Sequence, residues 1–167
     1  MGTSDDDLIR AIRGGKRGAF EALFDRHREW VVALAWRFTR DREEAEDVLQ
    51  ETFAYLHRKI PALDLTSRFK TFLYPVVKHL ALARVEKRRR ERPLAALPDT
   101  RTTAAPRDRL DDLLVGLSEV QQEVVLLRFA DGLDLQEIAR ALDVPLGTVK
   151  SRLHSALEVL RNNHPGR

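Results

Sequence analysis

The stretch that most limits how this chain can fold is residues 134–161, DLQEIARALDVPLGTVKSRLHSALEVLR. Apolar side chains recur at helical spacing in both halves, and the turn-forming segment Asp143-Val144-Pro145 separates them. Asp143 stands where such turns often carry glycine, and aspartate tolerates the left-handed backbone better than most residues. The pattern predicts a helix-turn-helix motif, whose second helix fits a DNA major groove.

The outward side of that second helix is the first candidate binding surface. Its side chains are short polar or cationic groups, which suit contact with phosphate oxygens and base edges in a major groove. The candidate DNA-binding residues there are Thr148, Lys150, Ser151, Arg152, His154 and Ser155.

Composition excludes several classes of protein. The 167 residues contain no cysteine, which excludes a disulfide framework and a thiolate metal site. The first ten residues, MGTSDDDLIR, are acidic and lack the apolar core of a signal peptide. No apolar run approaches the roughly 20 residues needed to span a bilayer. We therefore expect a cytoplasmic protein without membrane insertion.

Helical periodicity extends over nearly the whole chain, without strand-like alternation. Residues 92–107, RPLAALPDTRTTAAPR, carry prolines among small and polar residues, a composition typical of an extended linker. The expected fold is all-α, with two small helical domains, 1–91 and 108–167, joined by the flexible linker 92–107. The expected helices span about 4–13, 18–39, 41–59, 66–91, 108–116, 118–130, 134–142 and 146–162.

The expected helix 41–59 is strongly acidic and has one continuous outward face. Asp47, Gln50, Glu51 and Ala54 fall on that face at spacings i, i+3, i+4 and i+7. One interpretation is a solvated helix surface. The other is a docking surface for a basic protein partner, since a mixture of carboxylates and an amide suits a protein better than a metal ion. The residues alone leave both interpretations open.

Segment 68–92 is basic, and aromatic residues are interleaved at its start. This combination suits DNA whose bases are exposed, because rings stack on bases while cations hold phosphates. The alternative is structural: Phe69 and Leu80 would belong to the core face, and the cations of 87–90 would simply favour a helix C-terminus.

No enzymatic motif is present. The five histidines form no close ligand pair, and the chain has no P-loop, glycine-rich dinucleotide turn or Gly-x-Ser-x-Gly. We therefore expect a binding protein with no catalytic residues, no metal site and no cofactor.

These features, in this order, resemble the bacterial sigma-70 factors of the extracytoplasmic function (ECF) class, group IV. Residues 19–60 resemble conserved regions 2.1 and 2.2 of that family, residues 67–90 resemble regions 2.3 and 2.4, and residues 117–161 resemble region 4. The resemblance covers about two thirds of the chain.

The resemblance implies a role for each surface. The face of Asp47, Gln50, Glu51 and Ala54 would dock on the β′ clamp helices of core RNA polymerase, and the β flap would be a further contact. Helix 146–161 would read the promoter −35 element. The linker would thread through the core enzyme, and an anti-sigma factor, which many relatives have, would cover the same faces. The residues implied in −10 recognition and melting are Arg68, Lys70, Phe72, Lys78, His79, Arg84, Lys87 and Arg88.

The chain departs from the family pattern at several positions. Phe72, His79, Ala83 and Ser155 stand where Trp, Asn, Asp and Arg are common. Pro75 lies inside an expected helix, where it lacks a hydrogen-bond donor, so a kink or a restart is expected near Tyr74.

Two alternative functions stay open at this stage. The first is a helix-turn-helix regulator that does not bind core polymerase. Such a regulator would need a sensor or receiver domain, whereas residues 1–91 have an all-helical pattern. The second is an interaction protein that keeps the core-binding helix but no longer opens DNA.

Overall fold

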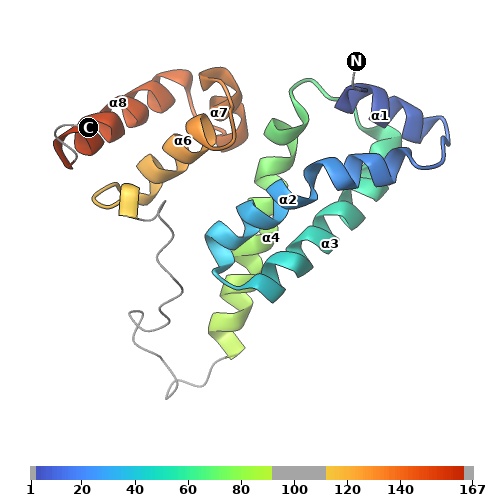
Figure 1. The fold of residues 1–167 in the computed structure, drawn as a ribbon, viewed down its shortest axis with the longest axis horizontal. Helices are drawn as coiled ribbons and strands as arrows, with labels where there is room; N and C mark the ends of the chain where they lie inside the picture. Colours follow the sequence, from blue (N-terminus) through green and yellow to red (C-terminus); the bar gives the residue numbers. More distant parts are fainter. Residues whose placement is uncertain (1–2, 92–111, 164–167) are drawn as a thin grey trace. The chain divides into compact units, whose positions relative to one another are not determined.

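The computed structural model describes residues 3–91 and 112–163, and the chain divides into two compact units, Met1–Pro93 and Leu94–Arg167 (Figure 1). Both units are helical, and no strand occurs among the described residues, which confirms the all-α prediction. The predicted linker 92–107 and residues 108–111 of the predicted helix 108–116 lie outside the described residues. Of the rest of that helix, residues 112–113 are helical and residues 114–116 form a turn.

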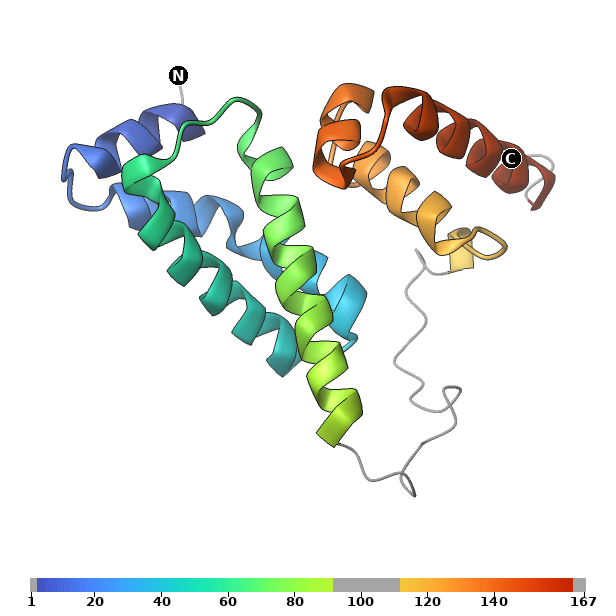
Figure 2. The ribbon, with the colours of Figure 1, turned by 180° about the vertical axis from the view of Figure 1, so that it is seen from behind.

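The first unit is built on three long helices. α2, α3 and α4 pack against one another in all three pairings, and Figure 2 shows them from the opposite side. The elements of this unit are α1 (Asp5–Arg13), α2 (Ala19–Thr39), α3 (Arg42–Lys59), the 3-10 turn η1 (Ile60–Ala62) and α4 (Phe69–Glu91). The side chains at their centre are at most 1% exposed and include Leu23, Val31, Leu34, Val48, Leu56, Leu73 and Val77.

Two helix starts follow from local capping chemistry. Ser4 forms a capping box with Asp7, because the Asp7 amide donates to Ser4 Oγ at 3.1 Å and the Ser4 amide donates to the Asp7 carboxylate at 3.2 Å. Asp41 caps α3 by accepting the Glu44 amide at 2.9 Å. Both starts agree with the sequence prediction.

α4 differs from its prediction in two ways. It begins at Phe69 rather than at residue 66 or 67. It also runs through Pro75 without interruption, so the restart predicted as one outcome near Tyr74 does not occur. An interior proline costs roughly 3 kcal/mol, whereas each buried large apolar side chain contributes about 1.5–3 kcal/mol. Leu73 and Val77, which are completely buried on either side of the exposed proline, therefore hold the helix together.

The second unit places a helix-turn-helix on a supporting helix. α6 (Glu119–Phe129) packs against α7 (Leu135–Leu142) and α8 (Leu146–Asn163), and α7 also packs against α8. One of its apolar clusters consists of the buried residues Leu114, Leu117, Val125 and Ala156, with Leu126, Leu153, Val159 and Leu160 packed against them. The predicted motif is therefore present.

The turn of the motif depends on Asp143. This residue adopts the left-handed conformation, with φ 52° and ψ 48°, and its amide donates to the carbonyls of Ala139 and Arg140. The backbone thereby ends α7 in the way that glycine commonly does, which confirms the expectation for this position. The Thr148 amide then donates to the Pro145 carbonyl at 2.9 Å, and α8 begins.

α1 is held on α2 by a polar cluster. Asp5 Oδ1 lies 2.7 Å from an Arg26 guanidinium nitrogen and 3.0 Å from His27 Nε2, and the His27 ring lies against Phe69 at 4.5 Å between centroids. Burial raises the pKa of Asp5, but hydrogen bonds and positive charge from His27 and Arg26 outweigh it, so the pKa lies below its ordinary value. Ionised Asp5 therefore stabilises the folded state.

We expect Asp5→Asn to lower the free energy of unfolding by about 1 kcal/mol at neutral pH. The lowered pKa means that the contribution of Asp5 is complete above the unfolded-state pKa, near 3.8, and is lost as the pH falls through the folded-state pKa. Urea unfolding of both proteins across pH should show the stability difference shrinking in acid. A difference that is constant with pH would contradict this role.

Candidate functional site

The acidic face predicted on α3 is formed as expected. Asp47, Gln50, Glu51 and Ala54 are all exposed, while the opposite side of the helix is buried. The buried side consists of Ala45, Val48, Leu49, Thr52, Phe53 and Leu56. We call the four exposed residues the α3 face. Carboxylates and an amide are thus presented on a helix whose position is fixed by the core.

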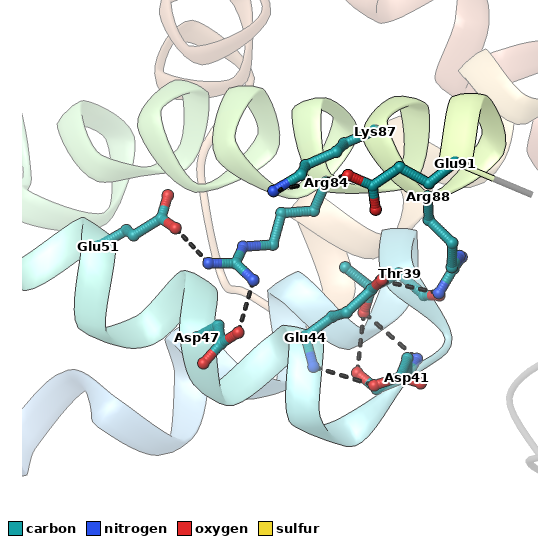
Figure 3. Close-up of polar contacts among 9 residues, drawn as sticks. All are labelled: Thr39, Asp41, Glu44, Asp47, Glu51, Arg84, Lys87, Arg88 and Glu91. Carbon is teal, nitrogen blue, oxygen red and sulfur yellow. Dashed lines mark hydrogen bonds and ion pairs between the residues drawn. The ribbon is translucent and has the colours of Figure 1, made fainter.

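Arg84 of α4 reaches across to this face (Figure 3). One guanidinium nitrogen lies 2.5 Å from Asp47 Oδ2, and the other donates to Glu51 Oε1. The hydrogen bond to Glu51 raises the pKa of Arg84 above its ordinary value, against the effect of burial, and both carboxylate charges add to it. Arg84 therefore stays a cation bound between two carboxylates that are one helical turn apart.

Arg88 makes a second link one turn further along α4. Its Nη1 donates to Glu44 Oε2 at 2.7 Å, and its Nη2 donates to the Thr39 carbonyl at 3.1 Å. The link joins the end of α4 to the turn between α2 and α3, as Figure 3 shows. Lys87, by contrast, pairs with Glu91 of its own helix at 3.8 Å.

Of the other predicted −10 residues, Arg68 directly precedes α4 and the rest lie on it. Arg68 and His79 are exposed, and Phe72 is half-buried between them on the same side of the helix by its spacing. Lys70 and Lys78 are half-buried because each lies over an aromatic ring of α2. These predicted residues therefore combine cations with an aromatic ring, and all are at least partly exposed.

Two aromatic residues of α2 lie beside these lysines. The sequence analysis did not assign them to a DNA-binding surface. The Lys70 ammonium lies 5.3 Å from the centroid of the Trp30 ring, and Lys78 lies 6.0 Å from that of Phe38. Both rings are only half-buried. The sequence signal that could have identified them is a large aromatic residue at the border of the apolar face of α2. Periodicity alone assigns such a residue to the core.

On α8 the predicted residues divide into two groups. Lys150, Ser151 and His154 are exposed on one side, and His154 lies 3.5 Å from Glu158. Thr148 and Arg152 are half-buried at the edges. Ser155 is exposed but accepts a hydrogen bond from Gln121 Nε2 of α6 at 2.9 Å. The outermost surface of the motif is therefore Lys150, Ser151 and His154.

In residues 3–91 and 112–163, no group of three or more histidine or acidic side chains is placed to hold a metal ion. No helix in the same ranges is long and apolar enough to cross a membrane.

Comparison with known protein families assigns both units. Sigma-70 region 2 matches residues 23–91, and sigma-70 region 4 matches residues 107–160. SigL of Mycobacterium tuberculosis, an ECF RNA polymerase sigma factor, is 31% identical over 168 residues, covering 92% of this chain and 93% of the relative. The chain belongs to the ECF RNA polymerase sigma factors. SigW of Bacillus subtilis, of the same family, is 27% identical over 173 residues, covering 92% of each chain.

Solved structures share the fold. CnrH, solved in complex with the cytosolic domain of CnrY, superposes with a TM-score of 0.66 at 21% identity, covering 93% of each chain. The sigma factor RpoE of Bartonella quintana, solved in complex with the anti-sigma factor NepR, gives a TM-score of 0.60 at 24% identity, covering 80% of this chain and 89% of that one. The alternative of a helix-turn-helix regulator is not favoured, because the first unit is sigma region 2.

We expect Arg88→Met to lower the free energy of unfolding by about 1 kcal/mol, since it leaves Glu44 and the Thr39 carbonyl without this donor at a partly exposed site. Arg90→Met is the matched control: Arg90 is 76% exposed and pairs with Glu86 within α4. Chemical unfolding of the full chain measures both. Equal effects of the two substitutions would show that the link does not hold α4.

Proposed function

We propose that this sigma factor binds core RNA polymerase through the α3 face and directs recognition and melting of promoter DNA through α4 and α8. The observation that carries the proposal is the α3 face itself. Its four residues lie within the region 2 match, all are exposed, and the buried side of α3 fixes their position. The family resemblance assigns such a face to the β′ clamp helices, and its carboxylates suit a basic partner.

For the −10 element we propose the predicted residues of α4 that do not bind α3, together with Arg68 just before the helix. Arg68, Lys70, Lys78 and Lys87 would hold phosphates, while Phe72 would stack on an unpaired base and His79 would contact DNA beside it. Arg84 and Arg88 were predicted for the same role. Their guanidinium groups are engaged by α2 and α3 in this structure, so the proposal rests on the other six residues.

For the −35 element we propose α8 as the helix that enters the major groove. Lys150, Ser151 and His154 occupy its outermost side, while Thr148, Arg152 and Ser155 lie beside them. Short polar side chains allow close approach of the helix to base edges, and the cations add phosphate contacts. The second unit would also contact the β flap.

The proposed role is one of binding, without a chemical step by the sigma factor. Capture of unstacked bases offsets the cost of unpairing, which is a few kcal/mol for each extruded base. The partners would be core polymerase, promoter DNA and an anti-sigma factor, and the protein would act in the cytoplasm.

We expect Asp47→Ala combined with Gln50→Ala to weaken binding to core RNA polymerase by about fivefold or more, since an exposed charge and an amide of the docking face are lost. Binding of the isolated DNA site by the second unit should not change. Asp25→Ala, which removes an exposed carboxylate from α2, is the control. Fluorescence anisotropy against purified core RNA polymerase measures the core affinity of the wild type and of both variants. Unchanged core affinity of the double variant would exclude this docking face.

We expect Lys150→Ala to reduce transcription several-fold from a promoter with its −35 element, because one cation facing the groove is removed. The same variant should transcribe normally from a template on which initiation does not depend on a −35 element. Run-off transcription on the two templates makes the comparison. Equal losses on both would assign Lys150 to a role other than −35 recognition.

A further inference from the structure

Arg84 occupies the proposed docking face from within the molecule. Resting on the proposed function, we propose that Arg84 is an internal counter-cation of the α3 face: it occupies Asp47 and Glu51 in the free protein, is displaced when core polymerase docks, and thereby sets the affinity and salt dependence of docking. Figure 3 shows the arginine reaching from α4 to both carboxylates.

The geometry supports occupation of both carboxylates at once. Each terminal nitrogen of Arg84 contacts one carboxylate: Nη1 lies 2.5 Å from Asp47 Oδ2, and Nη2 donates to Glu51 Oε1. Two carboxylates four residues apart on one helix repel each other, and the guanidinium between them relieves that repulsion. The free protein therefore presents one net negative charge from these three groups rather than two.

The carboxylates are nevertheless accessible to a competitor. The Asp47 side chain is 59% exposed and that of Glu51 44%, whereas Arg84 is 29% exposed. A cation of a partner can approach the carboxylates from solvent, on the side that Arg84 does not cover. Ion pairs at such exposure are weak, so a cationic partner surface can displace this one.

The bound position of Arg84 also leaves one of its own donors unsatisfied. Its Nε–H is buried and has no hydrogen-bond partner among residues 3–91 and 112–163. An unsatisfied buried donor costs free energy, and movement of the side chain into solvent would return water to that group. This cost lowers the barrier to displacement relative to a fully bonded arginine.

The other arginines near the end of α4 do not share this arrangement. Arg89 and Arg90 pair with Glu86 on their own helix and are each 76% exposed. Arg88 binds Glu44 and the Thr39 carbonyl, outside the α3 face. The chain thus offers Arg89 as a control that carries the same charge on the same helix and pairs with a carboxylate of that helix.

The test compares Arg84→Gln with Arg89→Gln in the full chain, by titrating each against core polymerase at several salt concentrations. Removing the competing cation should tighten binding of Arg84→Gln about two- to fivefold at low salt, with a steeper loss of affinity as salt rises. Arg89→Gln should bind like the wild type. Thermal unfolding of each variant establishes that it is folded.

Two results would overturn the proposal. Unchanged affinity of Arg84→Gln would show that the ion pairs do not compete with docking, and weaker binding would make Arg84 a residue that holds the face in place. Neither result contradicts docking through the α3 face, which the double substitution at Asp47 and Gln50 tests separately. Should that double variant bind core normally, the proposed function fails, whatever Arg84→Gln does.

Discussion

The structure of the first unit depends on one constraint: each of its three long helices can bury only one side. Leu23 and Leu34 of α2, Leu56 of α3 and Leu73 of α4 fill the shared interior and are almost inaccessible to solvent. Burial of this kind supplies most of the stability of a small helical unit. The opposite sides are then free to carry charge, and their positions in space follow from the core.

Charge is distributed over these outer sides according to what each helix faces. Where α3 and α4 lie together, carboxylates of α3 pair with arginines of α4. Arg84 pairs with Asp47 and Glu51, and Arg88 pairs with Glu44. Away from this contact, the exposed surfaces of the two helices carry different charges. α3 presents an acidic surface suited to a basic protein, and α4 presents cations and an aromatic ring suited to DNA.

This arrangement relates the two proposed binding events. A basic partner on α3 would bind carboxylates that also bind Arg84 of α4. Docking of polymerase and the position of the DNA-facing helix would therefore both depend on Arg84. The coupling needs no large movement, because only one partly exposed side chain changes its partner. Arg88 is half-buried and binds a backbone carbonyl as well, so it would maintain the contact between α4 and the α2–α3 turn.

The sequence predicted well what local chemistry determines. Ser4 and Asp41 mark helix starts because their side chains cap amides within the same turn, and Asp143 marks the turn of the motif because few residues tolerate its backbone. Periodicity likewise predicted that Asp47 and Gln50 are exposed.

Contacts between distant residues could not be predicted in the same way. Periodicity shows that a residue lies at the border of a core but not which helix it faces. The sequence therefore did not predict that Arg84 and Arg88 bind α3. The sequence left open whether α4 restarts at Pro75, for a related reason. The continuity of α4 depends on how deeply Leu73 and Val77 are buried against other helices, which the local sequence does not contain.

The central claim is that the two units act together to start transcription at specific promoters. Its most direct test is run-off transcription by core RNA polymerase, with and without this protein, on the DNA upstream of its own gene. The account predicts a discrete transcript that appears only when the protein is present. The absence of that transcript, together with failure of the protein to co-migrate with core polymerase on a sizing column, would contradict it.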